Sequence, residues 1–387
     1  MKSLEEIRRI NASFPYSEPI KEWKAQGKKV VGWICNYVPE EVIYAAGLLP
    51  VRLTGNSEEL NLTKADSYFF SNMCSYIRSC FELGLDGQFD FLDGIVACAS
   101  CQGPIRLAEL TEHYLHIPVI HIIDLPQKIE AQSVNFYCTE IQRFKEKLEQ
   151  FFDVKITEEA LIEAIEVHNE TRSLLKELYE LRKLNSPPIS GSEAMEIVNA
   201  SVRMPKKQFN LLLKSILEEV AAPFRVRKKE TPAKAGGYDG GVRIMLSGSI
   251  LNNAEFIKGI EDLGAQVAIE ELCTGARYFW EPVENKSDLL KAISRRYLYN
   301  FPCPCMNPSE LRINQVIDLI NDFQVKGVII EIIRWCIGFN FSQFILSQKL
   351  EKQGIPALNL DIEYGTPMTG QLKTRIEAFL EMIEGIV

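Results

Sequence analysis

Cysteine is the residue type whose number and placement in this chain could do chemistry. The sequence holds 10 cysteines and 4 histidines. A thiolate is a nucleophile and a ligand for soft metals, whereas a protonated thiol in a core behaves as a small apolar group. The positions of the cysteines along the chain therefore have to separate these two roles.

Cysteines follow four predicted strands, close to the points where the strands end. The strands and their cysteines are 30–34 with Cys35, 94–97 with Cys98 and Cys101, 266–272 with Cys273, and 328–333 with Cys336. In open parallel sheets, ligands bind beyond the carboxyl ends of the strands, where neighbouring loops converge. One cysteine in such a place usually fills a core. Thiols after four strands, in both halves of the chain, predict a shared site.

The other thiols lie on predicted loops or helices. Cys74 precedes a predicted helix over 75–83, whose positive N-terminus would favour the thiolate. Cys303 and Cys305 lie in a Cys-Pro-Cys-Met-Asn-Pro segment that the prolines hold extended. Cys80 and Cys138 are assigned to packing. The candidate ligands thus come from strand ends and from two loops.

The pattern of thiols favours an iron–sulfur cluster over zinc. Structural zinc sites usually use two closely spaced cysteine pairs. Cys98-x2-Cys101 has no matching second pair, and Cys303-x-Cys305 is too tight for a zinc knuckle. Thiolates spread over two domains suit an iron–sulfur cluster in the cleft between them.

Other chemistries have weaker support in the sequence. There is no Gly-x4-Gly-Lys-Ser/Thr phosphate loop and no Gly-x-Gly-x2-Gly turn, which argues against nucleotide hydrolysis on this chain. The turn 247–252 precedes a predicted helix and could hold an anion, although such turns are common. Asn252 and Glu255 are expected to cap that helix. The histidines without a metal-binding spacing, expected at the surface or in the core, are His113, His116 and His121.

Four strand–helix–strand units position these residues. They span 29–53, 91–124, 242–272 and 327–361, and each joins a β-rich run to a second apolar run through an amphipathic helix. Such units form parallel sheets. The sequence therefore predicts an α/β fold with two doubly wound, Rossmann-like parallel-sheet domains facing each other across a cleft. The expected divisions are an N-terminal α/β domain (1–138), a helical section ending in a Gly-rich linker (139–235), and a C-terminal α/β domain (236–387).

Composition narrows the partners and the compartment. The chain has 387 residues, 46% hydrophobic and 25% charged, with a net charge of -9. The acidic balance argues against nucleic acid as a partner. The longest apolar runs, such as 327–333, have the length of a strand, so no membrane span is expected. The charged N-terminus lacks the core of a secretion signal, which predicts a cytoplasmic protein in which disulfides are disfavoured.

Six segments together resemble the 2-hydroxyacyl-CoA dehydratase and benzoyl-CoA reductase D-component family over nearly the whole chain. Each contains a candidate cysteine or leads directly to one. The segments are 32–35 with 39–41, 72–78, 93–101, 272–277, 303–305 and 328–336.

The resemblance implies an iron–sulfur oxidoreductase that works in an anaerobic cytoplasm. Electrons would come from a separate ATP-hydrolysing activator with its own iron–sulfur cluster. The family's cluster ligands would map onto Cys74, Cys101 and Cys336. Gln102 stands where many relatives carry Asp, which leaves the substrate class open.

A second triad of thiols distinguishes two branches of the family. Cys35, Cys273 and Cys305, with Cys303 as the substitute for Cys305, would be superfluous for one cubane. Six thiolates resemble the set that holds an [8Fe-9S] double cubane in one branch, and we favour a homodimer of that kind. The alternatives are a [4Fe-4S] subunit of a 2-hydroxyacyl-CoA dehydratase (a lyase) or benzoyl-CoA reductase, in a heterodimer, and a non-catalytic electron-transfer subunit.

Overall fold

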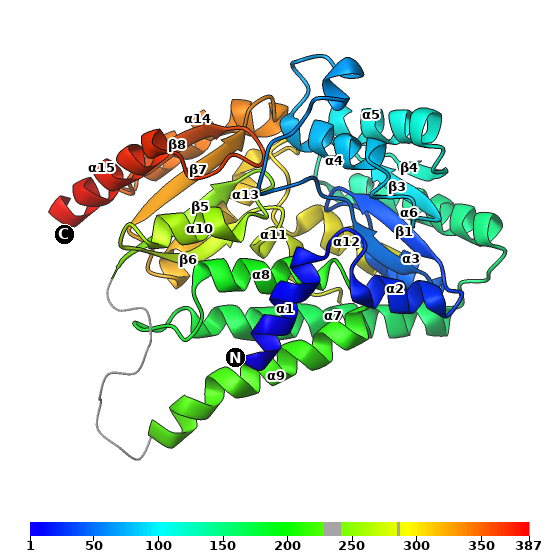
Figure 1. Cartoon of the computed structure of the whole chain (residues 1–387), viewed down its shortest axis with the longest axis horizontal. Coiled ribbons are helices and arrows are strands. Elements are labelled where there is room, and N and C mark those ends of the chain that lie inside the picture. Colours follow the sequence, from blue (N-terminus) through cyan, green and yellow to red (C-terminus); the bar gives the residue numbers. More distant parts are fainter. Residues whose placement is uncertain (228–240, 285–286, 387) are drawn as a thin grey trace.

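A computed structural model describes residues 1–227, 241–284 and 287–386. It contains two four-stranded sheets with helices around and between them (Figure 1). All strand pairs within the two sheets are parallel. The expected α/β fold with two doubly wound, Rossmann-like sheets is therefore confirmed. The predicted Gly-rich linker lies almost entirely outside the described residues.

The N-terminal sheet has the strand order β2-β1-β3-β4. Its central strand β1 reads Val-Val-Gly-Trp-Ile and is buried at every position, as expected for a parallel strand covered on both faces. The elements of this half are α1 (Lys2–Ala12), α2 (Glu18–Ala25), β1 (Val30–Ile34), α3 (Glu40–Ala45), β2 (Leu49–Arg52), η1 (Ala65–Ser67), α4 (Ser75–Leu85), β3 (Gly94–Cys98), α5 (Gln102–Leu110), η2 (Thr111–Leu115) and β4 (Val119–Ile123).

The C-terminal sheet has the corresponding order β6-β5-β7-β8. Its strands β6 and β7 are buried along their whole length. The elements of this half are β5 (Val242–Gly248), α10 (Ala254–Glu261), β6 (Ala265–Glu271), α11 (Ala276–Phe279), α12 (Leu289–Tyr299), α13 (Ser309–Asp322), β7 (Gly327–Ile333), α14 (Ile337–Glu351), β8 (Ala357–Ile362) and α15 (Gly370–Ile386).

Four helices that follow the N-terminal sheet and precede the C-terminal sheet in the sequence join the two halves. In Figure 1, α7 and α9 run beneath both halves, α8 lies beneath the C-terminal half, and α6 lies beside the N-terminal sheet. Helix α7 contacts α3 of the first half and α11 of the second, while α8 contacts α10 and β6. These helices are α6 (Ala131–Phe152), α7 (Glu158–Leu181), α8 (Gly191–Ser201) and α9 (Lys206–Arg227). None of the helices in the described part of the chain is long and apolar enough to cross a membrane.

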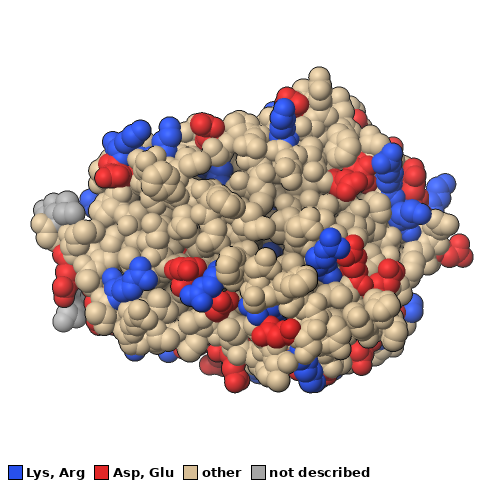
Figure 2. Space-filling view, turned by 90° about the horizontal axis from the view of Figure 1, so that it is seen from above, with Lys and Arg blue, Asp and Glu red and all other residues tan. Residues whose placement is uncertain are grey.

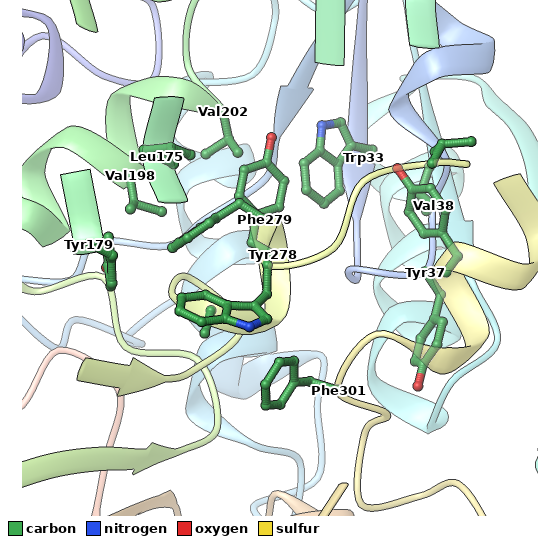
Figure 3. Close-up of a cluster of buried hydrophobic side chains, with 14 of the residues drawn as sticks. Trp33, Tyr37, Val38, Leu175, Tyr179, Val198, Val202, Tyr278, Phe279 and Phe301 are labelled. Atoms are coloured by element: carbon green, nitrogen blue, oxygen red, sulfur yellow. The ribbon is translucent and has the colours of Figure 1, made fainter. Parts of the chain in front are cut away.

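One hydrophobic core extends through all three regions. Trp33 of β1, Leu175 of α7 and Phe279 of α11 belong to the same buried cluster. Figure 3 shows how these side chains interlock, and the ring of Phe279 lies edge-on to that of Tyr179 with centroids 4.8 Å apart. Because close-packed interiors transmit strain and resist deformation, a shared core holds the carboxyl ends of the two sheets in a fixed relation.

Two local expectations for the loop after β5 were wrong. Ser247 and Gly248 continue the strand, because Gly248 pairs with Glu331 of β7, so the turn starts two residues later than expected. The cap of α10 is Asn253 and not Asn252: the Asn253 side chain accepts a hydrogen bond of 3.0 Å from the N–H of Phe256. The paired neighbouring strands, which a single segment cannot reveal, lengthen β5 and shift the helix start.

Candidate functional site

A cavity lies between the carboxyl ends of the two sheets. Its empty space amounts to about 900 Å³ when the open mouth is included. From above, the molecule has a hollow near its centre, bordered mainly by uncharged side chains, and charged side chains are scattered over the rest of this face (Figure 2). The cysteines that line the cavity are Cys35, Cys74, Cys101, Cys273, Cys303 and Cys336.

An outer cavity adjoins the first and shares four of its cysteines. Cys74, Cys101, Cys303 and Cys336 line both spaces, whereas Cys305 lines only the outer one. The structure therefore brings all six predicted ligands, and the substitute Cys303, into one region. Cys303 lies deeper in that region than Cys305.

Three of these cysteines occupy the N-cap positions of helices. Cys74 precedes α4, Cys101 precedes α5 and Cys336 precedes α14. Because the first backbone N–H groups of a helix point outward and carry partial positive charge, this position favours an anionic sulfur or cluster. The sequence predicted this setting for Cys74 alone, since the other two helix starts could not be placed so exactly.

Burial has the opposite effect on the free thiols. It raises the pKa of both Cys35 and Cys74 to about 11, and it also raises the pKa of Cys101 and Cys336. For Cys74, Cys101 and Cys336, desolvation therefore outweighs the effect of the helix N-termini. Metal binding at the site must therefore displace protons, as is general for thiolate ligands.

Cys35 lies on a strained turn between β1 and α3. Its φ of 82° falls in the left-handed region, which costs a residue other than glycine about 1–3 kcal/mol. Its Sγ is 3.0 Å from Oγ of Ser100, which follows the neighbouring strand β3. The turn thus holds the sulfur at the carboxyl edge of the N-terminal sheet.

Cys273 is held by residues from both halves. Its carbonyl oxygen accepts hydrogen bonds from Nη1 of Arg52 at 2.8 Å and from Nδ2 of Asn36 at 2.9 Å. Its Sγ lies 3.3 Å from Nη2 of Arg277 in α11. The backbone of Cys273 therefore joins the two sheets at the cavity, and its sulfur faces a guanidinium group.

The Cys303–Cys305 loop connects the two cavities. The N–H of Cys303 donates a 2.8 Å hydrogen bond to the hydroxyl oxygen of Tyr37. A hydrogen bond from the Cys305 thiol lowers the pKa of Cys303, and this bond and burial raise the pKa of Cys305. A Cβ at Gly338 would lie only 2.6 Å from the Cys305 sulfur, so this close approach requires glycine. The loop packs tightly against the start of α14.

The lining of the cavity combines thiols with arginines. Arg52, Arg277 and Arg296 all line it, and no described residue contributes a carboxylate or an imidazole to the lining. Arg277 is buried to 4% exposure, and its Nη1 has no hydrogen-bond partner within the described ranges. A buried guanidinium with an unpaired N–H beside cysteines is suited to an anionic group.

The donor set fits a cluster better than a single ion. Among residues 1–227, 241–284 and 287–386, no three His, Cys, Asp or Glu side chains lie close enough together to hold one metal ion. A cluster spreads its ligands over several iron atoms and therefore needs thiols around a cavity. The thiols, the helix N-termini and the arginines suit an iron–sulfur cluster.

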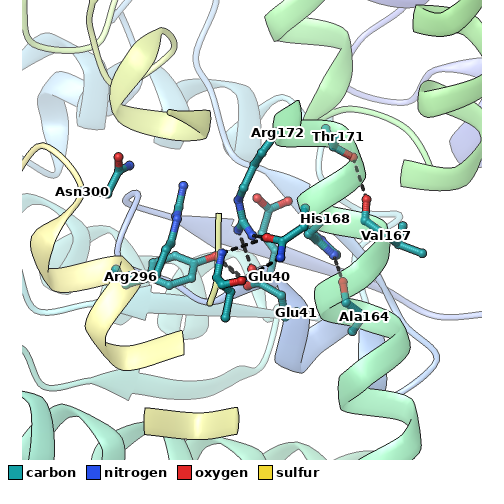
Figure 4. A network of polar contacts seen from close by, with 12 residues as sticks. Glu40, Glu41, Ala164, Val167, His168, Thr171, Arg172, Arg296 and Asn300 are labelled. Carbon is teal, nitrogen blue, oxygen red and sulfur yellow. Dashed lines mark hydrogen bonds and ion pairs between the residues drawn. The ribbon is translucent and has the colours of Figure 1, made fainter. Parts of the chain in front are cut away.

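A buried polar network supports the cavity wall from behind (Figure 4). Tyr297 of α12, which lines the cavity, donates a 2.8 Å hydrogen bond to Glu41 of α3, and Arg172 of α7 also binds Glu41. Lys206 of α9 pairs with Glu40 at 3.0 Å. His168 lies in the same network, where burial lowers its pKa to about 4. The network ties α3, α7 and α12 together.

The remaining cysteines and the predicted histidines lie away from the cavity lining. Cys80 and Cys98 are buried in the hydrophobic cores, and Cys138 is half-buried on α6. His113 and His116 are on or beside the turn after α5, and His121 is on β4. The placement of Cys80 agrees with a packing role.

Sequence reasoning missed the cationic side of the site. Arg52 and Arg296 were not singled out, and Arg277 was noted only as part of a motif. Arg52 ends β2, so an arginine that closes an apolar strand was a usable signal. Nothing local marks Arg296, which lies within α12.

Comparison with known proteins places the chain in a family. Residues 35–383 match the family described as 2-hydroxyglutaryl-CoA dehydratase, D-component. The putative dehydratase subunit YjiM of Escherichia coli is 28% identical over 372 residues, 94% of each chain. The beta subunit of (R)-2-hydroxyglutaryl-CoA dehydratase from Acidaminococcus fermentans is 26% identical, over 98% of each chain.

A reductase subunit is also similar to this chain. One of the subunits of benzoyl-CoA reductase from Thauera aromatica is 26% identical over 284 residues, which cover 72% of this chain and 71% of that one. The similarity thus includes both dehydratase and reductase subunits. Because the family match extends over most of the residues that form both sheets and the cysteine-lined cavity, the chain belongs to the 2-hydroxyglutaryl-CoA dehydratase D-component family.

Proposed function

We propose that this chain is the catalytic iron–sulfur component of a reductase, with its cluster in the cavity between the two sheets. The observation that carries the proposal is the lining: six cysteines and three arginines, without a carboxylate or imidazole from the described residues. An ATP-hydrolysing activator with its own cluster would deliver the electrons. The chain would reduce a small substrate as a homodimer in an anaerobic cytoplasm.

The distribution of thiols favours a double cubane with two triads. Cys74, Cys101 and Cys336 form the triad at the helix N-termini. Cys35 has Cys303 and Cys273 as its electrostatic neighbours, and both line the inner cavity with it. We therefore propose Cys35, Cys273 and Cys303 as the second triad. Cys305, which lines only the outer cavity, becomes the substitute.

The residues around the cavity would bind and insulate the cluster. When bound, the cluster supplies electrons at low potential. The guanidinium groups of Arg52 and Arg277 and the three helix N-termini offset the negative charge of the thiolates. Apolar side chains, among them Ile34, Ile333 and Phe339, limit water in the cavity. Solvent exposure, net charge and hydrogen bonds to sulfur together set the potential, so these residues would tune it.

A second candidate function is the single-cubane subunit of a 2-hydroxyacyl-CoA dehydratase or benzoyl-CoA reductase. The names of the relatives favour it, because they include dehydratase beta subunits and a reductase subunit. In that case Cys74, Cys101 and Cys336 would hold a [4Fe-4S] cluster, and a different chain would complete a heterodimer. The second triad would then have no cluster to hold.

Iron and sulfide analysis of the anaerobically purified chain separates the two candidates. The double cubane predicts about eight irons per chain, and the single cubane about four. In the double-cubane case, Cys35→Ser and Cys273→Ser should each remove half of the iron or more. Cys138→Ser, a half-buried thiol outside the cavity lining, is the matched control and should keep all of it.

The result also tests the wider proposal. A full iron complement and unchanged cluster spectra in both Cys35→Ser and Cys273→Ser would reject the double cubane. A wild-type chain that holds no iron when prepared without oxygen would reject both candidates. The pair Cys303→Ser and Cys305→Ser then assigns the loop ligand, and the larger iron loss is expected for Cys303→Ser.

A further inference from the structure

Glu331 is a buried carboxyl group on the central strand of the C-terminal sheet. It lies on β7 opposite Gly248 of β5 and has no exposed surface. Its Oε2 accepts a 3.3 Å hydrogen bond from Oγ of Ser249, while its Oε1 has no hydrogen-bond partner in the part of the chain that the structure describes. A carboxyl group in such a place needs an explanation, because burial without full pairing is costly.

Other buried carboxylates of the same sheet have direct cationic partners. Glu270 forms two hydrogen bonds with Arg182, at 2.6 and 2.9 Å, and Glu271 binds Arg312 at 2.6 Å. For Glu331, burial raises the pKa to about 8, although hydrogen bonds from Ser249 and the field of Arg277 oppose the shift. A buried carboxyl group without an ion pair keeps its proton near neutral pH. It can therefore donate one.

Ser249 contacts Glu331 and also belongs to the cavity lining. Its Oγ accepts a 3.1 Å hydrogen bond from the N–H of Ile333, which fixes the hydroxyl group beside the carboxyl. Its carbonyl oxygen accepts hydrogen bonds from the N–H of Cys273 at 3.1 Å and from Nη2 of Arg277 at 3.0 Å. The contacts that hold Ser249 thus come from the site itself.

We propose that Glu331 and Ser249 form a proton relay into the cysteine-lined cavity. Reduction of a substrate leaves extra negative charge on one of its atoms. The Ser249 hydroxyl, which donates to Glu331 at rest, turns toward that atom and gives it its proton. Ser249 Oγ then takes the proton of Glu331, which becomes a carboxylate. The electrons come from the cluster, so this use of the relay rests on the proposed function. After the product leaves, water at the cavity mouth returns the proton along the same path.

The surroundings of Glu331 suit this cycle. Arg277 of α11 is the cation whose field reaches the carboxyl group. Its Nε also lies 3.5 Å from Glu271, while its Nη1 has no hydrogen-bond partner among the described residues. Glu271 of β6 competes for this cation, but its shorter ion pair, of 2.6 Å, is with Arg312 of α13. On the other neighbouring strand, β8, the residue opposite Glu331 is the apolar Leu360. The carboxylate that forms during the cycle therefore has a cation to stabilise it, which allows release and recovery of the proton.

Infrared spectroscopy of the purified protein tests the relay without a substrate. The wild type should show the band of a protonated carboxyl group at neutral pH, which disappears as the pH rises through about 8. Glu331→Gln should remove that band. Glu261→Gln is the matched control, because Glu261 is also mostly buried with a raised pKa but binds the backbone of α8, away from the cavity. It should leave the Glu331 band in place.

Transfer into D2O then tests the link through Ser249. The band should shift as the carboxyl proton exchanges, and Ser249→Ala should slow this exchange by about a hundredfold, a usual contribution of a positioned proton-transfer group. Thermal melting would verify that each variant is folded. An absent neutral-pH band in the wild type, or the same exchange rate in Ser249→Ala, would overturn the relay.

The pH dependence of the cluster potential connects the relay to the proposed function. In the cluster-loaded wild type, the potential should become more negative as the pH rises above about 8, where Glu331 loses its proton. Glu331→Gln should abolish that dependence, and Glu261→Gln should keep it. A pH-independent wild-type potential would disprove coupling to the cluster. A chain without any cluster would disprove the proposed function, while the exchange experiment would still decide whether the relay exists.

Discussion

The two sheets share one strand order but carry different chemistry at their carboxyl ends. β2-β1-β3-β4 in the first half corresponds to β6-β5-β7-β8 in the second. The strands β1 and β3 end in apolar side chains and thiols, whereas β6 and β7 contain the buried carboxyl groups of Glu270, Glu271 and Glu331. The shared topology supplies the position of the site. The C-terminal half also supplies two of the three arginines that line the cavity, Arg277 and Arg296.

The comparison also identifies matching positions. Cys101 follows β3 and occupies the N-cap position of α5, and Cys336 follows the corresponding strand β7 and occupies the N-cap position of α14. Cys35 follows β1, and in the matching place after β5 the second half has Ser249. A shared framework thus places two thiols symmetrically and replaces a third by a hydroxyl group. The matched pairs allow the comparison to be tested one substitution at a time.

The largest effect is expected for the matched thiols. Cys101→Ser and Cys336→Ser should each lose at least half of the iron, because each sulfur lies at a helix N-terminus that helps to hold an anionic cluster. The measurement is iron per chain after anaerobic purification, with Cys80→Ser as a buried-thiol control. A loss in one variant without a loss in the other would break the equivalence of the two halves.

Removing the cation that pairs with a buried carboxylate of the C-terminal sheet should have the next largest effect. Arg182→Met leaves Glu270 buried without its cation, which we expect to lower the free energy of unfolding by about 3–5 kcal/mol. Urea denaturation measures the change. Adding Glu270→Leu should recover most of it, since an apolar pair replaces the ion pair. A double variant as unstable as the single one would mean that the guanidinium group contributes mainly through packing.

Acid should destabilise the protein through the network that ties α3 to α7. The pKa of His168 is about 4 in the fold and 6.5 as the reference value, so between these pH values the unfolded chain binds the extra proton. Stability from this group is complete above pH 6.5 and is lost as the pH falls toward 4, by about 3 kcal/mol. The lowered pKa of Glu41 acts in the same direction below its reference value of 4.5.

Urea midpoints at two pH values on either side of this window would measure the effect. His168→Asn keeps a donor for the carbonyl oxygen of Ala164, to which the Nδ1 of His168 is 2.7 Å away. This variant should make the free energy of unfolding less dependent on pH between pH 6.5 and 4. An unchanged slope would place the titration elsewhere in the molecule.

The smallest effect is expected when one buried methylene group is removed from either sheet, and the loss of stability should be equal in the two. Ile95 of β3 and Ile329 of β7 are both fully buried near the middle of corresponding strands. Ile95→Val and Ile329→Val should each cost about 1 kcal/mol, the usual loss for one buried methylene group. Thermal melting of the two variants provides the comparison. If the loss of stability differed several-fold between the two variants, one sheet would be packed more tightly than its counterpart.

The sequence predicts elements better than it predicts the partners of side chains. The buried strands 30–34 and 328–333 stand out because parallel strands are apolar on both faces, and the cysteines after them indicate the site. The cationic lining depends on contacts between distant segments, such as Arg52 with Cys273, and leaves no local pattern. The depth of Cys303 relative to Cys305 depends on a long-range contact with Tyr37.

The helix starts at the site have a consequence for how the protein matures. Cys74, Cys101 and Cys336 are N-cap residues, yet none makes the side-chain cap that serine or aspartate would provide. The first turns of α4, α5 and α14 instead have a sulfur near their backbone N–H groups, a weaker acceptor than a carboxylate or hydroxyl oxygen. We expect amide hydrogens there to exchange faster before the cluster is inserted than after. Amide exchange at these three helix starts would therefore report whether the cluster has been inserted.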